Sequence, residues 1–140
     1  KSLKDLKEFV NDMNILGNGV DIVSNSRIKK SIKNYKFINR IYSINEINES
    51  KKIKNKANFF AKRFAAKEAF AKSLGKGFRN GLNYKDISVK NNRFGKPEIL
   101  INYKIRSILK KIFKINKFKI YLSLSDEKKH SIAFVIINKI

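Results

Sequence analysis

The 140-residue sequence predicts an α+β fold, because helical and strand patterns occur in separate groups along the chain. Two segments place apolar residues at three- and four-residue steps, which is typical of amphipathic helices. Strand-like segments instead follow one another in pairs, as hairpins require. The patterns lie at helical residues 58–77 and 105–113, and at strand pairs 86–90 with 98–102 and 119–125 with 131–138.

The beginning of the chain predicts one extension and one strand. Residues 1–14 carry only a weak apolar stripe, and we interpret them as an N-terminal extension or an appended segment that precedes a single domain of residues 15–140. In the strand at 15–23, ILGNGVDIV, Gly17 and Gly19 permit a close backbone approach or a bulge. Asp21 interrupts this apolar strand. Asp21 is either a buried carboxylate, which must be paired or bound to a metal, or it lies on the solvent face or caps the next helix.

Basic residues dominate the next predicted helix, from about Arg27 to Asn39, after N-cap candidates at 24–26. They form either a solvated charged face or a docking surface for an acidic partner. A capping box at Ser43-Ile44-Asn45-Glu46 predicts another short helix. Residues 51–56 form a basic connector. The basic residues of the first helix are Arg27, Lys29, Lys30, Lys33 and Lys36.

The helix predicted at 58–77 concentrates the residues of greatest chemical interest. Its apolar stripe comprises Phe60, Phe64, Ala71 and Leu74, and Gly75 suits a left-handed residue at the helix end. Arg63 and Lys67 lie one turn apart, as do Glu68 and Lys72. A lone carboxylate among these cations suits a metal and phosphate site. The alternative is an exposed helix with an ordinary Glu68–Lys72 pair, worth about 0.3 kcal/mol.

The last third of the chain alternates turns, strands and one helix. After a loop at 78–85, the strand at 86–90 should turn Ile87 and Val89 inward. Residues 91–97, NNRFGKP, have turn chemistry and join this strand to the next one at 98–102. An amphipathic helix and two further strands, which residues 126–130 connect, complete the order β-α-α-α-β-β-α-β-β.

Composition excludes several classes of function. The formal charge of +22 favours anionic partners, although Lys is abundant even at positions that look structural. There is no Cys, and the only His, His130, lies in a polar turn, which argues against a zinc site or a serine triad. Neither a dinucleotide fingerprint nor a Walker loop is present. No apolar run of eighteen residues could span a membrane, and the N-terminus lacks the features of a secretory signal.

Five motifs together resemble the holo-[acyl-carrier-protein] synthases, the short bacterial type of 4′-phosphopantetheinyl transferase. The resemblance extends from Ile15 to Ile140 and implies their fold, an antiparallel sheet packed against helices. It also implies a cytoplasmic homotrimer with active sites between subunits. The motifs are GVDIV (19–23), FFAKRFAAKEAFAKSLG (59–75), DISV (86–89), FGKP (94–97) and SLSD (123–126).

The resemblance implies transfer of the phosphopantetheine arm of coenzyme A to a serine of acyl carrier protein, in support of fatty acid biosynthesis. Asp21 and Glu68 match the family carboxylates that bind Mg²⁺, a hard ion that accepts carboxylate and phosphate oxygens. Lys72 matches a lysine that contacts phosphate, and Glu68, directly or through a metal-bound water, is the candidate acceptor of the serine proton. The implied coenzyme A-binding positions are Arg63, Lys72, Gly75, Gly95, Lys96, Pro97 and Ser125.

The same resemblance gives the basic helix a partner, because it matches the helix that docks the acidic acyl carrier protein. Arg27, Lys30 and Lys33 are the predicted docking residues. One departure stands out: many members have His where this chain has Asp126, so no family role transfers to Asp126. The competing hypothesis is a nonenzymatic basic module that binds nucleic acid, which the charge and the interleaved aromatic residues would suit.

Overall fold

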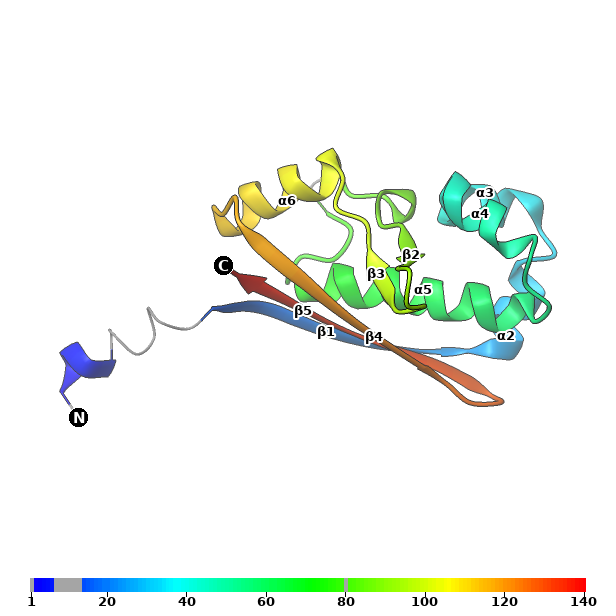
Figure 1. Ribbon diagram of the computed structural model, residues 1–140, viewed down its shortest axis with the longest axis horizontal. Coiled ribbons are helices and arrows are strands. Elements are labelled where there is room, and N and C mark those ends of the chain that lie inside the picture. Colours follow the sequence, from blue (N-terminus) through cyan, green and yellow to red (C-terminus); the bar gives the residue numbers. More distant parts are fainter. Residues whose placement is uncertain (1, 7–13, 80) are drawn as a thin grey trace.

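A computed structural model describes residues 2–6, 14–79 and 81–140 and confirms the predicted α+β class. The chain begins its main sheet with one strand, forms four helices, makes a small hairpin and a fifth helix, and returns to the sheet with two strands (Figure 1). The elements are β1 (Ile15–Ser24), α2 (Asn25–Ser31), α3 (Tyr35–Ile41), α4 (Ile44–Ser50), α5 (Lys56–Ser73), the 3₁₀ helix η1 (Tyr84–Asp86), β2 (Val89–Asn91), β3 (Pro97–Ile99), α6 (Tyr103–Phe113), β4 (Phe118–Asp126) and β5 (His130–Lys139).

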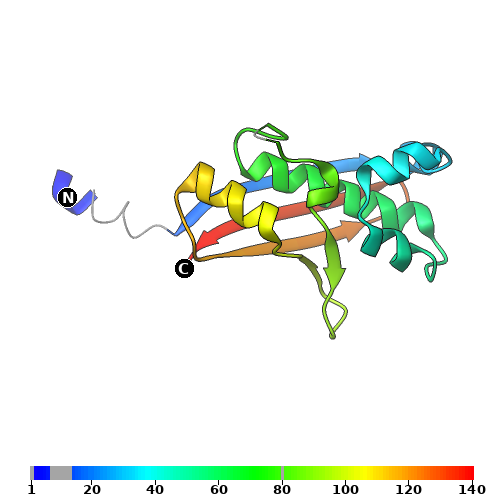
Figure 2. The ribbon, with the colours of Figure 1, turned by 90° about the horizontal axis from the view of Figure 1, so that it is seen from above.

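The main sheet is antiparallel, with the strand order β1–β5–β4. Helices α5 and α6 cover one face, while α2, α3 and α4 gather near one end (Figures 1 and 2). Within the described part of the chain the other face is uncovered, and its apolar side chains are exposed. Cross-strand pairing of Val20 with Phe134 and of Ile22 with Ile132 groups them. The exposed apolar residues are Val20, Ile22, Tyr121, Ile132 and Phe134.

Helix α5 is buried around most of its circumference, so the alternative of an exposed helix is wrong. Four alanines of α5, at positions 61, 65, 66 and 69, have no exposed surface and let neighbouring elements approach the helix backbone. Larger residues of α5 fill the core above the sheet. Phe64, which was predicted to lie on the apolar stripe, is only half-buried. The buried apolar residues of α5 are Phe59, Phe60, Ala61, Ala65, Ala66, Ala69, Phe70 and Ala71.

The contact between α5 and β1 depends on two glycines, as the sequence predicted. A Cβ atom on Gly19 would lie 2.0 Å from the carbonyl oxygen of Ala69, and one on Gly17 would lie 2.0 Å from that of Ser73. Real Cβ atoms do not approach other atoms so closely, because van der Waals repulsion rises steeply at that distance. The register of β1 also shifts between Ile15 and Gly17. Glycine therefore allows the helix backbone to rest directly on the strand.

The helix predicted at 27–39 is instead two helices, and this prediction was wrong. Helix α2 ends at Ser31, and Asn34 begins α3 by accepting a hydrogen bond from the Lys36 amide at 2.9 Å. An Asn side chain competes with the helix for backbone donors, which favours a new N-terminus over continuation. The capping box at Ser43 and Glu46 is confirmed at the start of α4.

The end of α5 and the small hairpin differ from their predicted limits by a few residues. Helix α5 ends at Ser73 rather than at 77, but Gly75 has a φ of 78°, as expected for a left-handed residue. Strands β2 and β3 are shorter than predicted, because Asp86 belongs to η1 and Asn102 is the N-cap of α6. Ile87 and Val89 are buried, and the Asn92 amide closes the turn on the Lys96 carbonyl at 2.7 Å.

The structure describes residues 2–6 and Asn14 of the N-terminal segment. The weak apolar stripe predicted here comprises Leu3, Leu6, Phe9 and Val10. Residues 3–6 form a single helical turn with Leu3 and Leu6 exposed, whereas Phe9 and Val10 lie outside the described residues. The assignment of residues 1–14 to an extension stays a prediction. In the described ranges, no helix combines the length and the apolar character that crossing a membrane would require.

Replacing Gly19 with Ala should destabilise the fold by about 3 kcal/mol, because the added methyl group must displace α5 from β1. Guanidinium unfolding at a fixed subunit concentration measures this loss. Asn18→Ala is the matched control, since Asn18 is the exposed neighbour on the same strand. Equal stability of the two variants would contradict the direct helix–strand contact.

Candidate active site

Asp21 and Lys72 meet where β1 passes α5. The Lys72 ammonium donates to Oδ1 of Asp21 at 3.0 Å and to the Val20 carbonyl at 3.1 Å. The Asp21 side chain is 14% exposed, although Val20 and Ile22 beside it face outward. Asp21 therefore lies on the helix-covered side of the strand, and the alternative of a solvent-facing carboxylate is wrong. The direct contact at Gly19 brings α5 within reach of this carboxylate.

Glu68 lies one turn before Lys72 on α5 and is half-buried. Its Oε1 accepts a hydrogen bond from the Tyr84 hydroxyl at 2.6 Å. Within the described ranges the structure has no ion pair between Glu68 and Lys72, because each has a partner from another segment. An ordinary surface pair of Glu68 with Lys72 is therefore not what the helix contains.

Asp21 contacts Lys72, and Glu68 lies one helical turn before Lys72, so the two carboxylates lie on adjoining elements. Burial raises the pKa of Tyr84, and the hydrogen bond to Glu68 and the charges of Glu68 and Asp21 add to this shift. No group of three or more His, Cys, Asp or Glu side chains that could hold a metal ion occurs among residues 2–6, 14–79 and 81–140. Two hard carboxylate donors suit Mg²⁺, which commonly takes one or two carboxylates and completes its shell with substrate phosphates and waters. The donor set therefore fits Mg²⁺ that binds together with a diphosphate.

Arg63 belongs to a second cluster of residues, which lines a cavity on another side of α5 and includes Lys62 and Asp126. It lies five residues before Glu68, which places the two side chains about 140° apart around the helix axis. The Arg63 guanidinium stacks over Phe59 at 3.7 Å from the ring centroid, and its Nε is buried without a hydrogen-bond partner. Burial lowers the pKa of Arg63, while Glu46 and Glu49 oppose that shift. Such a donor can bind an anion in the cavity beside it.

The cavity at Arg63 has a volume of about 310 Å³ and contains most of the second cluster. Asp126 lies there on β4, where it accepts from the Asn58 amide at 2.9 Å and lies 3.8 Å from the Lys62 ammonium. Asp126, to which the sequence assigned no role, therefore has defined contacts with two residues of α5. The residues lining the cavity are Glu49, Ile53, Asn55, Asn58, Phe59, Lys62, Arg63, Asn91 and Asp126.

The remaining predicted coenzyme A residues fall into both regions. Gly75 follows α5 one residue beyond its C-cap, Leu74, close in sequence to Lys72. Pro97 pairs with Asn91, a residue of the 310 Å³ cavity, and Gly95 and Lys96 form the turn of the same hairpin. Ser125 pairs with Ile132 and so shares the uncovered face of the sheet. The structure therefore does not unite the predicted residues in one site within a single chain.

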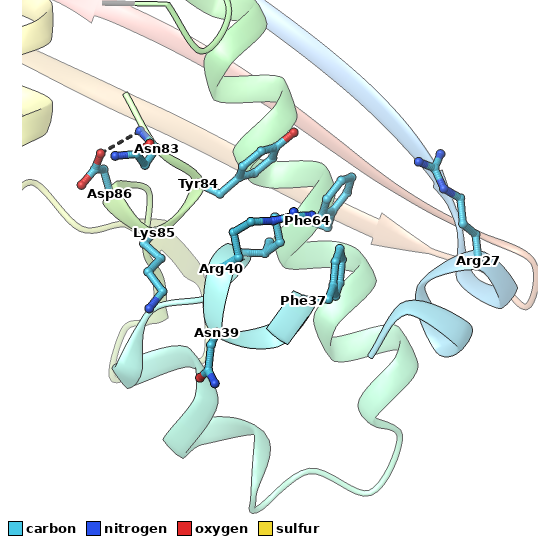
Figure 3. Close-up of a pocket in the computed structure, with 10 residues that line it drawn as sticks. Arg27, Phe37, Asn39, Arg40, Phe64, Asn83, Tyr84, Lys85 and Asp86 are labelled. Atoms are coloured by element: carbon cyan, nitrogen blue, oxygen red, sulfur yellow. Dashed lines mark hydrogen bonds between the residues drawn. The ribbon is translucent and has the colours of Figure 1, made fainter. Parts of the chain in front are cut away.

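The predicted docking residues lie on α2 and directly after it, and one of them, Arg27, lines a cavity that Tyr84 also lines. Arg27, Lys30 and Lys33 are all exposed, and Lys33 lies between α2 and α3 rather than within one helix. Arg27 lines a cavity of about 740 Å³ together with Arg40 and Tyr84, and Figure 3 shows these side chains around it. Basic and aromatic side chains thus line this cavity together with Tyr84, the residue that hydrogen-bonds to Glu68.

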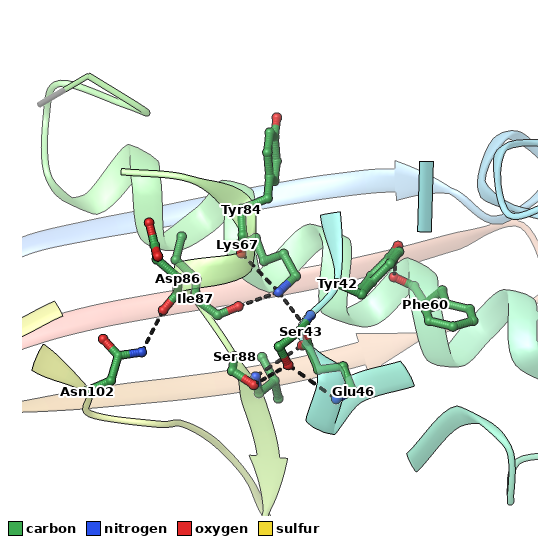
Figure 4. A network of polar contacts seen from close by, with 11 residues as sticks. Tyr42, Ser43, Glu46, Phe60, Lys67, Tyr84, Asp86, Ile87, Ser88 and Asn102 are labelled. Atoms are coloured by element: carbon green, nitrogen blue, oxygen red, sulfur yellow. Dashed lines mark hydrogen bonds and ion pairs between the residues drawn. The ribbon is translucent and has the colours of Figure 1, made fainter. Parts of the chain in front are cut away.

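Lys67 points away from the site, which corrects its inclusion in the proposed metal and phosphate cluster. It is fully buried and donates to Oε1 of Glu46 at 2.6 Å, to the Tyr84 carbonyl at 3.2 Å and to the Ile87 carbonyl (Figure 4). Glu46 also accepts from the amides of Ser43 and Val89. Burial lowers the pKa of Lys67, and the Glu46 charge opposes that shift. The pair ties α4 and the loop at 84–89 to α5.

Sequence reasoning missed Tyr84, Arg40 and the core partner of Lys67. Tyr84 lies in a stretch without periodicity that was predicted as a loop, so no pattern indicated that its hydroxyl returns to α5. Glu46 was recognised only as a capping residue. Its second role depends on Lys67, which is 21 residues away in sequence. A lysine on an apolar-rich helix needs a carboxylate partner if it is buried, and this need was the only indication in the sequence that Lys67 has a partner such as Glu46.

Comparisons with known proteins agree on one family. A family model described as the 4′-phosphopantetheinyl transferase superfamily matches residues 17–135. The holo-[acyl-carrier-protein] synthase of Pelagibacter ubique is 58% identical over 127 residues, which cover 91% of this chain and 99% of that protein. The solved synthase of Neisseria meningitidis has a TM-score of 0.81 and 37% identity and covers 89% of this chain and 99% of its own. The Bacillus anthracis synthase in complex with CoA (3′,5′-ADP) has a TM-score of 0.76 and 32% identity, covering 91% and 99%.

Replacing Lys67 with Met should lower the free energy of unfolding by about 4 kcal/mol, because Glu46 would remain buried without its counter-charge. Lys62→Met is the control, since the Lys62–Asp126 pair is partly exposed and its loss should cost at most about 1 kcal/mol. Denaturant unfolding of both variants measures the difference. A loss for Lys67→Met no larger than that of the control would contradict the buried-pair assignment.

Proposed function

The chain belongs to the 4′-phosphopantetheinyl transferase superfamily, and we propose that it carries out the reaction of the holo-[acyl-carrier-protein] synthases in it. The 4′-phosphopantetheine group of coenzyme A is transferred to a serine of apo-acyl carrier protein, with release of adenosine 3′,5′-bisphosphate. This modification supplies the carrier for fatty acid biosynthesis. The observation that carries the proposal is the meeting of Asp21 with Lys72, one helical turn from Glu68, in a chain 58% identical to such a synthase.

Asp21 and Glu68 are the proposed Mg²⁺ ligands. Bound Mg²⁺ would neutralise charge on the diphosphate and polarise the phosphorus that the serine attacks. The two carboxylates come from β1 and α5, whose direct contact at Gly19 fixes their relative position. The Glu68 side chain, with one oxygen held by Tyr84, is also the proposed acceptor of the serine proton.

Lys72 is the proposed phosphate-binding cation of the same site. Its ammonium pairs with Asp21, yet its side chain is 55% exposed and flexible enough to reach a ligand beside that carboxylate. A cation near the leaving diphosphate stabilises the charge that develops as the phosphoanhydride bond breaks. Lys72 therefore neutralises Asp21 in the free protein and contributes to charge stabilisation in the complex.

A homotrimer with active sites between subunits would reconcile the two separated clusters. Within one chain the helix α5 stands between Glu68 and Arg63, but a neighbouring subunit can supply the second cluster. Exposed Val20, Ile22 and Phe134 on the uncovered sheet face support association through that face, because burying them removes apolar surface from water. In this arrangement the buried Nε of Arg63 and the residues around it contact the nucleotide end of coenzyme A. Gly75, Gly95, Lys96, Pro97 and Ser125 complete the proposed coenzyme A-binding set.

The basic end of the molecule is the proposed docking surface for acyl carrier protein. Arg27, Lys30 and Lys33 are exposed there, and Arg27 lines the 740 Å³ cavity next to Tyr84. Pairing with carboxylates of an acidic carrier speeds encounter at low ionic strength, and added salt screens it. The cytoplasmic location implied by the resemblance stays a prediction.

The proposed reaction predicts that apo-acyl carrier protein gains the mass of one phosphopantetheine group only when coenzyme A and Mg²⁺ are both supplied. Intact-protein mass spectrometry of the carrier, with and without excess chelator, measures this directly. Full modification in chelator would refute the metal requirement. If the carrier stayed unmodified while the protein bound RNA or DNA independently of Asp21 and Glu68, the nonenzymatic alternative would replace the proposal.

Glu68→Gln and Arg63→Gln should each lower transfer at least about 100-fold, because one removes the carboxylate and the other the anion-binding cation. When the two inactive variants are mixed and reassembled, about a quarter of wild-type activity should return, since a site between subunits needs only one intact residue from each.

Reassembly of Glu68→Gln with itself is the control for activity recovered by refolding alone. An affinity tag carried by only one of the two variants, with recovery of the untagged variant on the same resin, verifies that both chains share oligomers. If mixed oligomers formed without recovered activity, the assignment of Glu68 and Arg63 to different subunits of one site would be wrong.

A further inference from the structure

We infer that Tyr84 is a positioning residue for Glu68, whose carboxylate it holds so that one oxygen is fixed and the other faces the reacting groups. This inference rests on the proposed function, because it concerns the same carboxylate. It goes further by assigning a role to a residue of η1 that belongs to none of the motifs in the sequence. Tyr84 would act through Glu68 rather than touch the diphosphate itself.

The contact between the two side chains is short and specific. The Tyr84 hydroxyl donates to Oε1 of Glu68 at 2.6 Å, a distance typical of a hydroxyl bound to a charged carboxylate. Within residues 2–6, 14–79 and 81–140, Oε2 of Glu68 makes no hydrogen bond. A glutamate has three rotatable bonds and would otherwise sample several rotamers. The hydrogen bond therefore selects one orientation and leaves the second oxygen available.

Aromatic packing holds the ring of Tyr84 in place. The ring stacks on Phe64 with centroids 5.7 Å apart and an interplanar angle of 16°. On Phe78 it packs with centroids 4.0 Å apart and an angle of 30°. Figure 3 shows the Tyr84 ring beside Phe64. Phe64 lies one turn before Glu68 on α5, so the Tyr84 ring rests on the same side of the helix as the carboxylate. Aromatic contacts thus aim the hydroxyl along α5.

The backbone of Tyr84 is fixed independently of its ring. Its carbonyl accepts from the buried Lys67 ammonium at 3.2 Å, and that ammonium is itself held by Glu46 at 2.6 Å (Figure 4). The ends of η1 are tied by the Asn83 amide to Asp86 at 2.8 Å and by Asn102 to the Asp86 carbonyl at 2.9 Å. Lys67 and Glu68 are consecutive on α5. Lys67 therefore holds the backbone of Tyr84, and Tyr84 in turn orients Glu68.

The chemistry of Tyr84 suits positioning rather than proton transfer. A phenol has an ordinary pKa of about 10 and is protonated at neutral pH, and the Tyr84 hydroxyl donates to Oε1 of Glu68. The hydroxyl therefore keeps its proton at neutral pH and remains a donor. A phenol that stays protonated cannot accept the serine proton, so that role stays with Glu68.

Tyr84→Phe tests the inference, because it keeps the ring and the carbonyl contact and removes only the hydroxyl. A hydrogen bond to a charged group is worth roughly tenfold in an equilibrium constant. We therefore expect about tenfold weaker Mg²⁺ binding in calorimetric titrations with coenzyme A and no carrier protein. The turnover number should fall by about the same factor, with the KM for carrier protein unchanged.

Tyr103→Phe is the matched control, since Tyr103 is 85% exposed, and it should leave Mg²⁺ binding and turnover unchanged. In a Glu68→Gln background, adding Tyr84→Phe should have no further effect on transfer, because the carboxylate it acts through is gone. Additive losses would overturn the inference, as would wild-type Mg²⁺ affinity in Tyr84→Phe. Wild-type protein that fails to modify the carrier would instead refute the proposed function, so the two failures are distinguishable.

Discussion

The direct packing of α5 on β1 is the constraint on which the rest of the structure depends. Gly17 and Gly19 remove the side chains that would separate the two backbones, and the helix residues that meet them, Ala69 and Ser73, are themselves small. This contact buries apolar residues of the core, and it also places the Asp21 carboxylate of β1 beside the Lys72 ammonium of α5. Stability and site geometry therefore share one interface, and a residue larger than glycine at position 19 would disturb both.

A buried polar network transmits this order to the elements around α5. Lys67 and Glu46 are enclosed in the core, where an unpaired charge would be costly, so each must satisfy the other and nearby backbone groups. Through this pair the capping box of α4 and the loop before β2 acquire fixed positions on the helix. The Tyr84 hydroxyl then reaches Glu68 as a consequence of core packing, not of any local motif. The consecutive residues Lys67 and Glu68 of α5 therefore connect the buried polar network of the core with the proposed catalytic site.

The candidate residues lie in two separate clusters, which would come together in one active site only if subunits associate. One chain provides Asp21, Glu68 and Lys72 on one side of α5, and Arg63 with its cavity on another. The uncovered apolar face of the sheet offers a surface through which a second copy could complete the site. A small domain buries a limited fraction of its surface alone, and association of subunits offsets that limit. Oligomerisation and substrate binding would then depend on the same surfaces.

The sequence by itself determined the fold class, most of the elements, the close approach at Gly17 and Gly19 and the capping box at Ser43, because periodicity, turn residues and caps act over a few positions. Motif resemblance added the family and the candidates Asp21, Glu68 and Lys72. Only the tertiary structure decided that Lys67 is a core residue paired with Glu46, that Arg63 lies apart from Glu68, and that Asn34 divides the basic helix. It alone brought Tyr84 to Glu68. These outcomes depend on which side of a helix meets which distant segment, and local patterns carry no information about contacts between residues far apart in the chain.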